Sequence, residues 1–462
     1  MGVAPIEFDS DLVRRFDRAG PRYTSYPTAD RFSESFGEAS YRLWAARRNI
    51  GGVRRPLAIY VHLPFCRDIC FYCACNKIVT RNSATAAEYL GFLYREIEMQ
   101  SRLFRDDARV VQMHWGGGTP TYYDAGQMRQ LFQRLAGHFE FSAEGEYSIE
   151  IDPRTVDADT IVSLRETGFN RVSFGVQDYD PQVQAAIHRL QSEAQTRAAI
   201  DAARAAGFAS VNVDLIYGLP KQTLASLGAT FERVIDARPD RIALYNYAHL
   251  PLLVKSQRRI LEADLPSPDV KLKLLELAIR MLSTAGYVYI GMDHFALPGD
   301  ALAVAQRTGQ LHRNFQGYST LAGADLIGLG VSAIGAVGPT YSQNVRGLDE
   351  YYACIERGAL PILRGIELNA DDLVRRAVIQ ALMCHFSISK ESIGSSYLLE
   401  FDQYFAAELG ELRAFEKEGM LEMDKGWITV TPRGRFMIRS ICMVFDRYLQ
   451  KTGSGGRYSR VI

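Results

Sequence analysis

The sequence predicts an α/β protein whose largest part is an incomplete TIM-like barrel. Six β-rich segments alternate with amphipathic helical patterns between Leu57 and Asn246, which is typical of a parallel sheet with right-handed crossovers. Polar residues stand at or near the carboxyl ends of these segments, namely Glu150, Asp152, Gln177, Asp214 and Asn246. An open doubly wound sheet also fits the alternation, but barrel enzymes build their sites at the carboxyl ends of strands, so this placement favours the barrel.

The alternating elements follow in chain order. The predicted strands are Leu57–Leu63, Val110–Trp115, Tyr147–Ile151, Arg171–Val176, Ser210–Ile216 and Arg241–Asn246. The helical patterns are Thr85–Phe104, Ala125–Phe139, Ala158–Glu166, Gln191–Ala206 and Leu224–Ala237. Gly168 and Gly207 stand just after two of these helices, where a left-handed cap is expected.

Other segments flank this core. Pro21 and Pro27 make the piece GPRYTSYPT (residues 20–28) extended or turning. A helix is predicted over Val270–Ala285 and Gly-rich loops after it, and the uncharged run Leu326–Val345 is expected to form buried loops and turns. Asn369 can cap a helix starting at Asp371. A further helix over Leu399–Gly419 and a hairpin over Met420–Val430 complete a mostly helical, winged-helix-like domain.

We therefore divide the 462 residues into four parts. We expect residues 1–50 to form an N-terminal extension and residues 51–290 to form the partial barrel. We expect residues 291–368 to complete the barrel and residues 369–462 to form the C-terminal helical domain. That the first and third parts contribute to a substrate site is implied only by the family resemblance described below.

Charge and composition exclude several classes of protein. Lys and Arg together number 53, as do Asp and Glu, so the chain lacks the positive excess of proteins that bind nucleic acid or anionic membranes. The start MGVAPIEFDSDL has neither a basic nor an apolar signal region, and no run resembles a membrane helix. We expect a cytoplasmic monomer without nucleic-acid or membrane partners, and the C-terminal domain is not expected to bind DNA.

Cysteine spacing indicates a metal centre. Four of the seven cysteines fall within ten residues, at Cys66, Cys70, Cys73 and Cys75, in a chain without a secretory signal. A tetrahedral zinc site is one interpretation, but an iron–sulfur cluster is larger and suits such short spacings better. The spacing does not decide whether three or four thiolates bind. The remaining three, Cys354, Cys384 and Cys442, are expected to be small buried hydrophobes.

The cysteine spacing C-x3-C-x2-C, with Tyr72 before the third cysteine, resembles the signature of the radical S-adenosylmethionine (SAM) superfamily. Further segments are similar to the oxygen-independent coproporphyrinogen III oxidase family within it: GPRYTSYPT, YVHLPFC, HWGGGTPT, SIEIDPR, SFGVQD, NVDLIYGLPKQT, YNYAHLP, HRNFQGYST and GLGVSAIG. The resemblance implies a partial (β/α)6 barrel. It also implies oxidative decarboxylation of two propionates of coproporphyrinogen III to vinyls, giving protoporphyrinogen IX for heme by a 5′-deoxyadenosyl radical mechanism.

The resemblance also implies residue roles. It places a 4Fe–4S cluster on Cys66, Cys70 and Cys73, with SAM on the fourth iron and Cys75 as a required cysteine that is not a ligand. Contacts to this SAM match Tyr60, Gly117, Glu150 and Ile334, and contacts to a second SAM match Tyr72, Gly118, Thr119, Gln177, Arg189, Asp214 and Ala248. Catalytic roles fall on Cys75, Tyr60, Phe315 and Gln316. Ala74 and Tyr72 depart from the family, which usually has Gly and Phe there.

Several of these residues have plainer interpretations taken alone. Gly116–Gly118 fits a tight βα turn, Arg189 an exposed helical charge, and His62 and His114 hydrogen-bonded core histidines. A buried Asp214 needs a hydrogen-bond partner or a ligand. A substrate with four carboxylates requires cations and aromatic walls, for which the candidates are Arg22, Arg313, Lys77, Tyr23, Tyr26 and Phe315.

Two other functions remain open from the sequence. One is a heme-binding trafficking protein of the same superfamily, and the other is a zinc-stabilised regulator that uses the C-terminal domain. The stretch His312–Gln316 and Cys75 both favour the oxidase, because the trafficking relatives tend to lack them. An oxidase further requires an electron donor and an electron acceptor, whose identities the sequence does not give.

Overall fold

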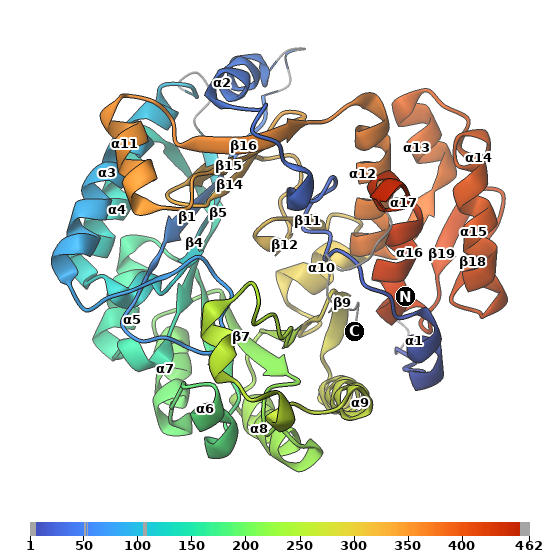
Figure 1. Ribbon diagram of the computed structural model, residues 1–462, viewed down its shortest axis with the longest axis horizontal. Helices are drawn as coiled ribbons and strands as arrows, with labels where there is room; N and C mark the ends of the chain where they lie inside the picture. The colour runs from blue at the N-terminus through green and yellow to red at the C-terminus, as the bar shows by residue number, and fades with distance from the viewer. Residues whose placement is uncertain (1–5, 50–51, 53, 105–108, 453–462) are drawn as a thin grey trace. The chain divides into compact units, whose positions relative to one another are not determined.

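The computed structural model describes residues 6–49, 52, 54–104 and 109–452 (Figure 1). These residues form two compact units, each discontinuous in sequence. Unit 1 contains Met1–Asp30, Lys271–Ala322 and Leu368–Ile462, and unit 2 contains Arg31–Val270 and Gly323–Glu367. The predicted boundary between residues 50 and 51 lies outside the described residues, as do the first five residues of the start examined for a signal.

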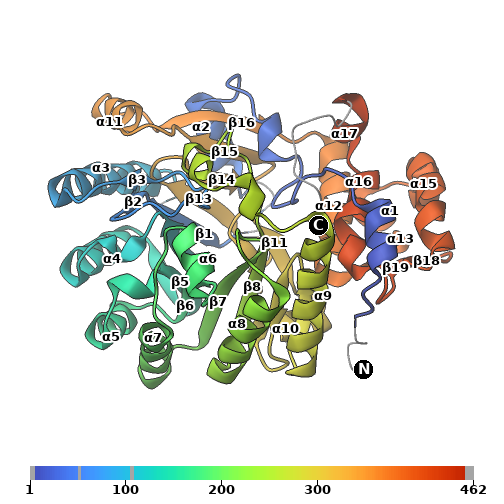
Figure 2. The ribbon, with the colours of Figure 1, turned by 60° about the horizontal axis from the view of Figure 1, so that its bottom comes forward.

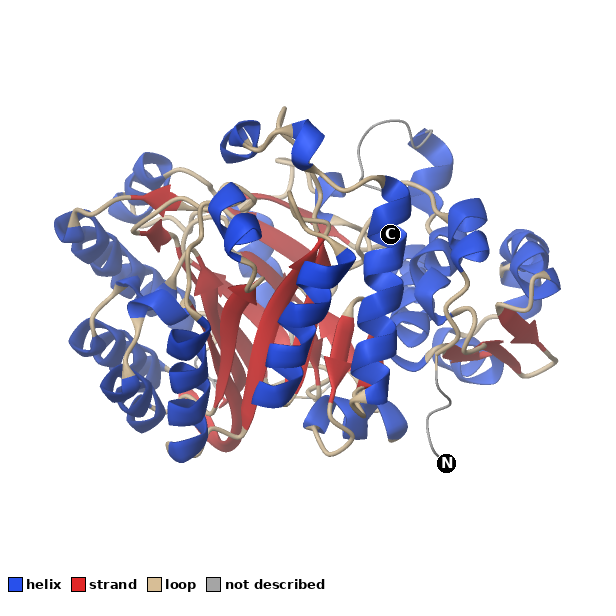
Figure 3. Ribbon diagram, turned by 90° about the horizontal axis from the view of Figure 1, so that it is seen from below, coloured by secondary structure: helices blue, strands red, loops and turns tan. Residues whose placement is uncertain are grey.

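Unit 2 is built on a parallel sheet. Its strands in chain order are β1 (Leu57–Leu63), β4 (Arg109–Gly117), β5 (Glu140–Ile151), β6 (Arg171–Gln177), β7 (Ser210–Tyr217) and β8 (Arg241–Asn246). Each pairs in parallel with the next, and each contains its predicted segment. Figure 3 shows these strands with helices along the outside. The alternation in the sequence therefore predicted the sheet that carries the site.

The crossover helices lie on one side of this sheet (Figure 2). They are α3 (Ser83–Ser101), α4 (Ala125–His138), α5 (Ala158–Thr167), α7 (Glu193–Ala205) and α8 (Leu224–Ala237). Local chemistry fixes their ends: Asp124 forms a capping box with Gln127 at the start of α4. Gly168 and Gly207 have φ values of 126° and 77° after α5 and α7, which confirms the predicted left-handed caps.

The sheet of unit 2 continues beyond β1, and here one prediction is wrong. The run Leu326–Val345 contains most of β13 (Asp325–Leu329), together with β14 (Ile334–Val337) and β15 (Thr340–Asn344), rather than only loops and turns. β13 pairs in parallel with β1, and β14 and β15 follow antiparallel, with β16 (Ile362–Glu367) at the edge. A Cβ at Gly328 would lie 2.8 Å from the backbone of Ile334, so the glycine that suggested a loop permits close packing of strands.

A buried carboxylate links α3 to this sheet and to a neighbouring helix. Glu96 on α3 accepts hydrogen bonds from the Gly330 amide (2.7 Å) and the Asn344 side chain (2.8 Å). The Tyr351 hydroxyl, on α11 (Leu348–Glu356), donates to it at 2.7 Å. Burial raises the pKa of Glu96 to about 7, although these donors oppose the shift. The carboxyl group is therefore partly protonated near neutral pH in the folded chain.

Replacing Glu96 by Gln is expected to change how stability depends on pH. Because the folded pKa lies above the ordinary value of 4.5, the contribution of this group to stability is complete below pH 4.5 and is lost as the pH rises through about 7. The free energy of unfolding of the wild type, relative to Glu96→Gln, should fall by roughly 1–3 kcal/mol between pH 4 and pH 8. Denaturant unfolding at both pH values measures this difference.

Glu98 offers the matched control on the same helix, since its side chain is 50% exposed and pairs with Arg102. Glu98→Gln should leave the pH profile of unfolding unchanged. Parallel profiles for wild type and Glu96→Gln would contradict the raised pKa.

Unit 1 contains the C-terminal helices and a small sheet. Asn369 forms a capping box at the start of α12 (Ala370–His385), as predicted. The sheet orders β17 (Ser387–Ser389), β19 (Trp427–Val430) and β18 (Leu421–Met423), and the predicted hairpin is confirmed. The predicted single helix over Leu399–Gly419 is wrong, because Phe405 (φ −105°, ψ 27°) separates α14 (Phe401–Tyr404) from α15 (Ala406–Lys417).

The remaining elements of unit 1 are short apart from one helix. They are α1 (Ser10–Phe16), α9 (Pro268–Thr284), β9 (Val288–Gly291), β10 (His294–Ala296), α10 (Ala301–Arg307), β11 (His312–Asn314), β12 (Gly317–Ser319), α13 (Lys390–Tyr397), α16 (Ile438–Val444) and α17 (Arg447–Thr452). Arg439 on α16 donates to the Gly20 carbonyl at 2.8 Å, and Tyr23 donates to Asp446 at 2.9 Å. The extended N-terminal piece is thus bound to α16 and to the residue that precedes α17. In the described part of the chain, no helix has the length and apolar character needed to cross a membrane.

Candidate active site

A cavity of about 660 Å³ lies in unit 2 at the carboxyl ends of the parallel strands. Its volume is in the range of small-molecule sites. Twelve of the predicted site residues line it: Cys66, Cys70, Tyr72, Cys73, Cys75, Gly117, Gly118, Thr119, Glu150, Gln177, Arg189 and Asp214. Residues of the cysteine loop and residues at the carboxyl ends of strands therefore lie around one cavity.

The cysteine loop occupies one wall of the cavity. It runs from β2 (Phe65–Cys66) to β3 (Ile78–Val79), and these two short strands pair in parallel and close its base. The Cys73 amide donates to the Cys70 carbonyl at 3.3 Å, and Lys77 donates to the Cys73 carbonyl at 2.7 Å. The loop is thus held by its own backbone, and its thiols lie within one short turn-rich segment.

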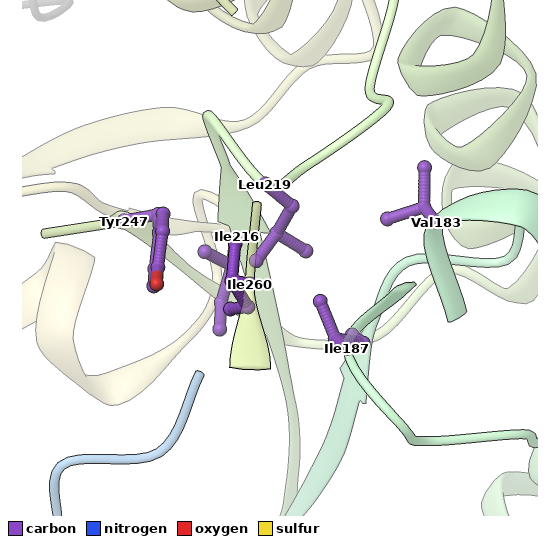
Figure 4. Packing of buried hydrophobic residues seen from close by; sticks show 6 residues of the cluster. All are labelled: Val183, Ile187, Ile216, Leu219, Tyr247 and Ile260. Carbon is purple, nitrogen blue, oxygen red and sulfur yellow. The ribbon is translucent and has the colours of Figure 1, made fainter. Parts of the chain in front are cut away.

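An apolar cluster, whose buried side chains are drawn in Figure 4, packs against two residues of this loop. Its buried members are Val183, Ile187, Ile216, Leu219, Tyr247 and Ile260. Phe71 and Tyr72 pack against it. Gln257 adds a polar tie, since its amide donates to the carbonyls of Tyr72 (2.9 Å) and Ala248 (3.1 Å). Ala248 is therefore connected to the loop through Gln257, although it does not line the cavity.

The four thiols differ in electrostatic character. Burial raises the pKa of Cys66 to about 11. A hydrogen bond from Cys75, helped by the charge of Lys77, lowers the pKa of Cys73 to about 6, and the same bond raises the pKa of Cys75 well above its ordinary value. Thiolates are the metal-binding form of cysteine. Cys73 thus has the character of a ligand, and Cys75 that of a protonated donor beside it.

The described residues contain no group of three or more His, Cys, Asp or Glu side chains that could hold a single metal ion. A structural zinc site needs four such donors about 2.0–2.3 Å from one ion. An iron–sulfur cluster spreads its irons over a cube, so its thiolates are farther apart. The donor set, four cysteine thiols that line one cavity, fits such a cluster with three or four of them as ligands.

The glycines at the end of β4 are needed for packing within the protein. A Cβ at Gly116 would lie 2.8 Å from the Glu150 carboxylate, and one at Gly117 (φ 114°) would lie 2.6 Å from the His62 ring. We therefore attribute these glycines first to the tight turn and to the close approach of protein groups.

Two carboxylates face the cavity from neighbouring parts of the sheet. Glu150 lies 3.2 Å from Nε2 of His114 and accepts from the Gly117 amide at 3.3 Å. Burial raises the pKa of Glu150, but these partners outweigh it and the pKa lies below its ordinary value. Asp214 accepts from Ser173 (3.0 Å) and Asn212 (2.8 Å), while burial, followed by the charge of Glu150, raises the pKa of Asp214 to about 6. Asp214 thus has the hydrogen-bond partners that its position in an apolar strand requires, and both are partly buried.

The histidines of β1 and β4 are bonded within the protein, as their plainer interpretation predicts. Nδ1 of His62 lies 3.1 Å from the Tyr60 hydroxyl, and Nε2 lies 2.9 Å from the Asn76 carbonyl. The His114 ring stacks on Tyr60 with centroids 6.0 Å apart. Tyr60 does not line the cavity, but it contacts both histidines, one of which bonds to Glu150.

Arg189 departs from its plainer interpretation. It follows α6 (Pro181–Ala186) and is only 6% exposed, so it is not an exposed helical charge. It donates to Asp152 at 3.0 Å and to the Gly175 carbonyl at 2.7 Å. Arg154 also lines the cavity and was missed from the sequence. Its place after a strand end, in SIEIDPR, was the available signal.

The remaining predicted residues do not line this cavity. Ile334 lies on β14 in unit 2. Phe315 and Gln316 belong to unit 1, in the turn between β11 and β12, where the Gln316 amide donates to Asn314 at 2.8 Å. Of the three cysteines expected to be buried, Cys384 and Cys442 are buried, whereas Cys354 is partly exposed.

Comparison with known proteins adds independent findings. Residues 60–234 match the family model described as "Radical SAM superfamily", and residues 368–437 match the "HemN C-terminal domain". Oxygen-independent coproporphyrinogen III oxidase of Pseudomonas aeruginosa is 49% identical over 459 residues, covering 99% of each chain. The Escherichia coli protein of the same name is 47% identical over 462 residues, covering 100% of each. A solved structure of coproporphyrinogen III oxidase from Escherichia coli, described as a radical SAM enzyme, superposes with a TM-score of 0.92 over 96% of this chain and 100% of that one.

Proposed function

Since the chain belongs to the oxygen-independent coproporphyrinogen III oxidases of the radical SAM superfamily, we propose that it converts two propionates of coproporphyrinogen III to vinyls. The product is protoporphyrinogen IX, an intermediate of heme biosynthesis. The observation that carries this proposal is the cysteine loop, which presents three candidate thiolate ligands to a cavity at the carboxyl ends of a parallel sheet. Each conversion removes CO2, one hydrogen atom and one electron from a propionate.

We propose that Cys66, Cys70 and Cys73 hold a 4Fe–4S cluster and that Cys75 is not a ligand. The cluster and SAM supply the one-electron reduction that starts radical chemistry. Residues of the chain bind and orient these groups and exclude water from the cavity. The hydrogen bond from Cys75 and the charge of Lys77 lower the pKa of Cys73 to about 6, which favours the thiolate form of that ligand.

We further propose two SAM molecules per chain. One would contact Tyr60, Gly117, Glu150 and Ile334, and the other would contact Tyr72, Gly118, Thr119, Gln177, Arg189, Asp214 and Ala248. Most of these residues line the same cavity, and ionised Glu150 suits the ammonium group of SAM. Equilibrium dialysis with labelled SAM tests the stoichiometry, and one molecule per chain would contradict it.

We propose that arginines of unit 1 bind the propionates of the substrate. Burial raises the pKa of Asp293, whereas the charges of Arg22, Arg439 and Arg313 oppose that shift, so three cations act on one carboxylate. Arg313 is 8% exposed, and its Nε and one terminal nitrogen have no hydrogen-bond partner among the described residues. Its guanidinium lies over the Tyr318 ring, 4.6 Å from the centroid. Lys77 is a weaker candidate, since it is bonded to the cysteine loop.

Arg22→Ala should raise the KM for coproporphyrinogen III by about 10- to 100-fold, because a charged hydrogen bond contributes roughly 1.5–3 kcal/mol. Cleavage of SAM in the absence of substrate should change much less. Steady-state kinetics and quantification of 5′-deoxyadenosine measure the two effects. Arg15→Ala is the control, since Arg15 pairs with Glu418 at 2.8 Å in the same unit and should leave KM unchanged. An unchanged KM for Arg22→Ala would remove Arg22 from the substrate site.

The proposed function itself is tested by anaerobic incubation with coproporphyrinogen III, SAM and a reductant. Mass analysis should find protoporphyrinogen IX with two CO2 released per molecule. Heme titration of the same preparation examines the alternative of a heme-trafficking relative. Tight heme binding without CO2 release would favour that alternative.

We propose a cytoplasmic location and a monomeric state. None of the seven cysteines forms a disulfide, which is typical of proteins in reducing compartments. Size-exclusion chromatography with light scattering tests the monomer. Nucleic acid is not proposed as a partner, because the chain has no excess of positive charge. An electron donor and an electron acceptor are required, and their identities stay open.

A further inference from the structure

Two arginines approach the sulfur of one proposed cluster ligand. A terminal nitrogen of Arg189 lies 3.7 Å from Sγ of Cys70, and one of Arg154 lies 3.9 Å from the same sulfur. Both distances are within the range of an N–H donor to sulfur. Cys70 is thus the only proposed ligand for which the described residues show two guanidinium groups at its sulfur.

A single carboxylate holds both arginines in place. Asp152 accepts from Arg154 at 2.6 Å and from Arg189 at 3.0 Å. The side chains of Asp152 and Arg189 are 8% and 7% exposed, and that of Arg154 is 22% exposed. Burial raises the pKa of Asp152, but the two guanidinium charges outweigh it and hold the pKa below its ordinary value. Asp152, Arg154 and Arg189 together therefore carry a net charge of +1. We call Arg154 and Arg189 the arginine pair.

The backbone also fixes Arg189 against the cysteine loop. His188, the residue before it, has a φ of 54°, a conformation that is uncommon for residues other than Gly. The His188 ring stacks on Phe71 with centroids 4.9 Å apart, and its Nδ1 lies 2.8 Å from the Ile69 carbonyl. Phe71 in turn donates its amide to the Ile187 carbonyl at 2.9 Å. The segment that carries Arg189 thus has three contacts with the residues on either side of Cys70.

We propose that the arginine pair raises the reduction potential of the cluster by acting through Cys70. This inference rests on the cluster assignment of the proposed function. Reduction adds one electron, and therefore one negative charge, from the external reductant that the function already requires. Nearby positive charge and N–H donors to a ligand sulfur stabilise the reduced state, and both are known means by which proteins set cluster potentials. Arg154 and Arg189 are in this role positioning residues that act through the cysteine.

The sign of the effect distinguishes this role from a merely structural one. Arg154→Gln removes a positive charge and should shift the reduction equilibrium about tenfold toward the oxidised cluster, which corresponds to ~59 mV for one electron. Asp152→Asn removes a negative charge and should shift it in the opposite direction. Arg154→Lys keeps the charge and should move it less than Arg154→Gln. A structural disturbance has no reason to act in opposite directions in the two variants.

The measurement is a redox titration monitored by electron paramagnetic resonance, on anaerobically reconstituted full-length protein without SAM or substrate. Iron and sulfide analysis checks that each variant holds its cluster. Arg171→Gln is the matched control, because Arg171 forms a half-buried pair with Glu146 at 2.7 Å at the opposite ends of the strands. It should leave the potential unchanged.

Equal potentials for wild type and Arg154→Gln, or a lower potential in Asp152→Asn, would overturn the inference. If Arg154→Gln does not retain a cluster, the direction in which Asp152→Asn shifts the reduction potential tests the inference alone. Failure here is separable from failure of the proposed function. If the wild type forms protoporphyrinogen IX but the variants have its reduction potential, only the inference is contradicted. If the potentials of the variants shift but the wild type forms no product, only the proposed function is contradicted.

Discussion

Cys75→Ser should retain the iron, sulfide and visible absorbance of the wild-type protein while turnover of coproporphyrinogen III falls at least about 100-fold, equivalent to ~2.7 kcal/mol in the activation barrier. The structural reason is the bond between Cys75 and Cys73, which leaves Cys75 as the protonated partner. A serine hydroxyl can keep that hydrogen bond, so the ligand Cys73 is little disturbed. The serine hydroxyl lacks the weaker S–H bond and the polarisable sulfur of the thiol, and we expect turnover to fall for that reason.

Two other cysteines provide controls for this experiment. Cys73→Ser should lose most of the iron, since it removes a proposed ligand. Cys354→Ser should keep both iron and turnover, because Cys354 lies on α11 and lines no part of the cavity. Loss of iron in Cys75→Ser would mean that four thiolates bind the cluster. No iron would then be open to SAM, and the proposed chemistry would fail.

Glu150→Gln should weaken SAM binding about 10- to 100-fold without loss of cluster, because a hydrogen bond to a charged group contributes roughly 1.5–3 kcal/mol. The side chain is 44% exposed toward the cavity and has a lowered pKa, so it offers a carboxylate at all pH values near neutrality. Gln preserves its size and removes its charge. Equilibrium dialysis with SAM measures the dissociation constant.

Glu146→Gln is the matched control for this second variant. Glu146 lies earlier on the same strand, pairs with Arg171 and does not line the cavity, so its neutralisation should leave SAM affinity unchanged. If Glu150→Gln binds SAM as tightly as the wild type does, the Glu150 carboxylate does not contact SAM.

The parallel sheet could be predicted because each of its strands is a short apolar segment bounded by turn residues. Local signals also predicted the capping of α12 by Asn369 and the ends of α5 and α7. The strands of Leu326–Val345 could not be predicted in this way. Glycine within a strand is favourable only where a neighbouring backbone approaches closely, as at Gly328, and such an approach depends on residues distant in sequence.

Some residues of the candidate site could likewise be predicted from the sequence, and others could not. Residues at the carboxyl ends of strands, such as Glu150 and Gln177, could be placed at the cavity from the sequence, since parallel strands end at one edge. Arg189 was placed there only by the family resemblance, because its burial depends on Asp152 and on the conformation of His188. Arg154 was missed for a similar reason: its role becomes visible only beside the sulfur of Cys70, which lies far from it in the sequence.

The short pairing of β2 with β3 has a consequence for how the metal centre is assembled. The Ile78 amide donates to the Pro64 carbonyl at 2.8 Å, and the Thr80 amide donates to the Cys66 carbonyl at 3.0 Å, so the ends of the loop are joined by the protein alone. Small zinc domains fold only when they bind metal, so metal binding has to offset the conformational entropy that the chain loses on folding. Here these backbone bonds order both ends of the loop, so a cluster bound by the cysteines would have to order only the residues between Cys66 and Ile78.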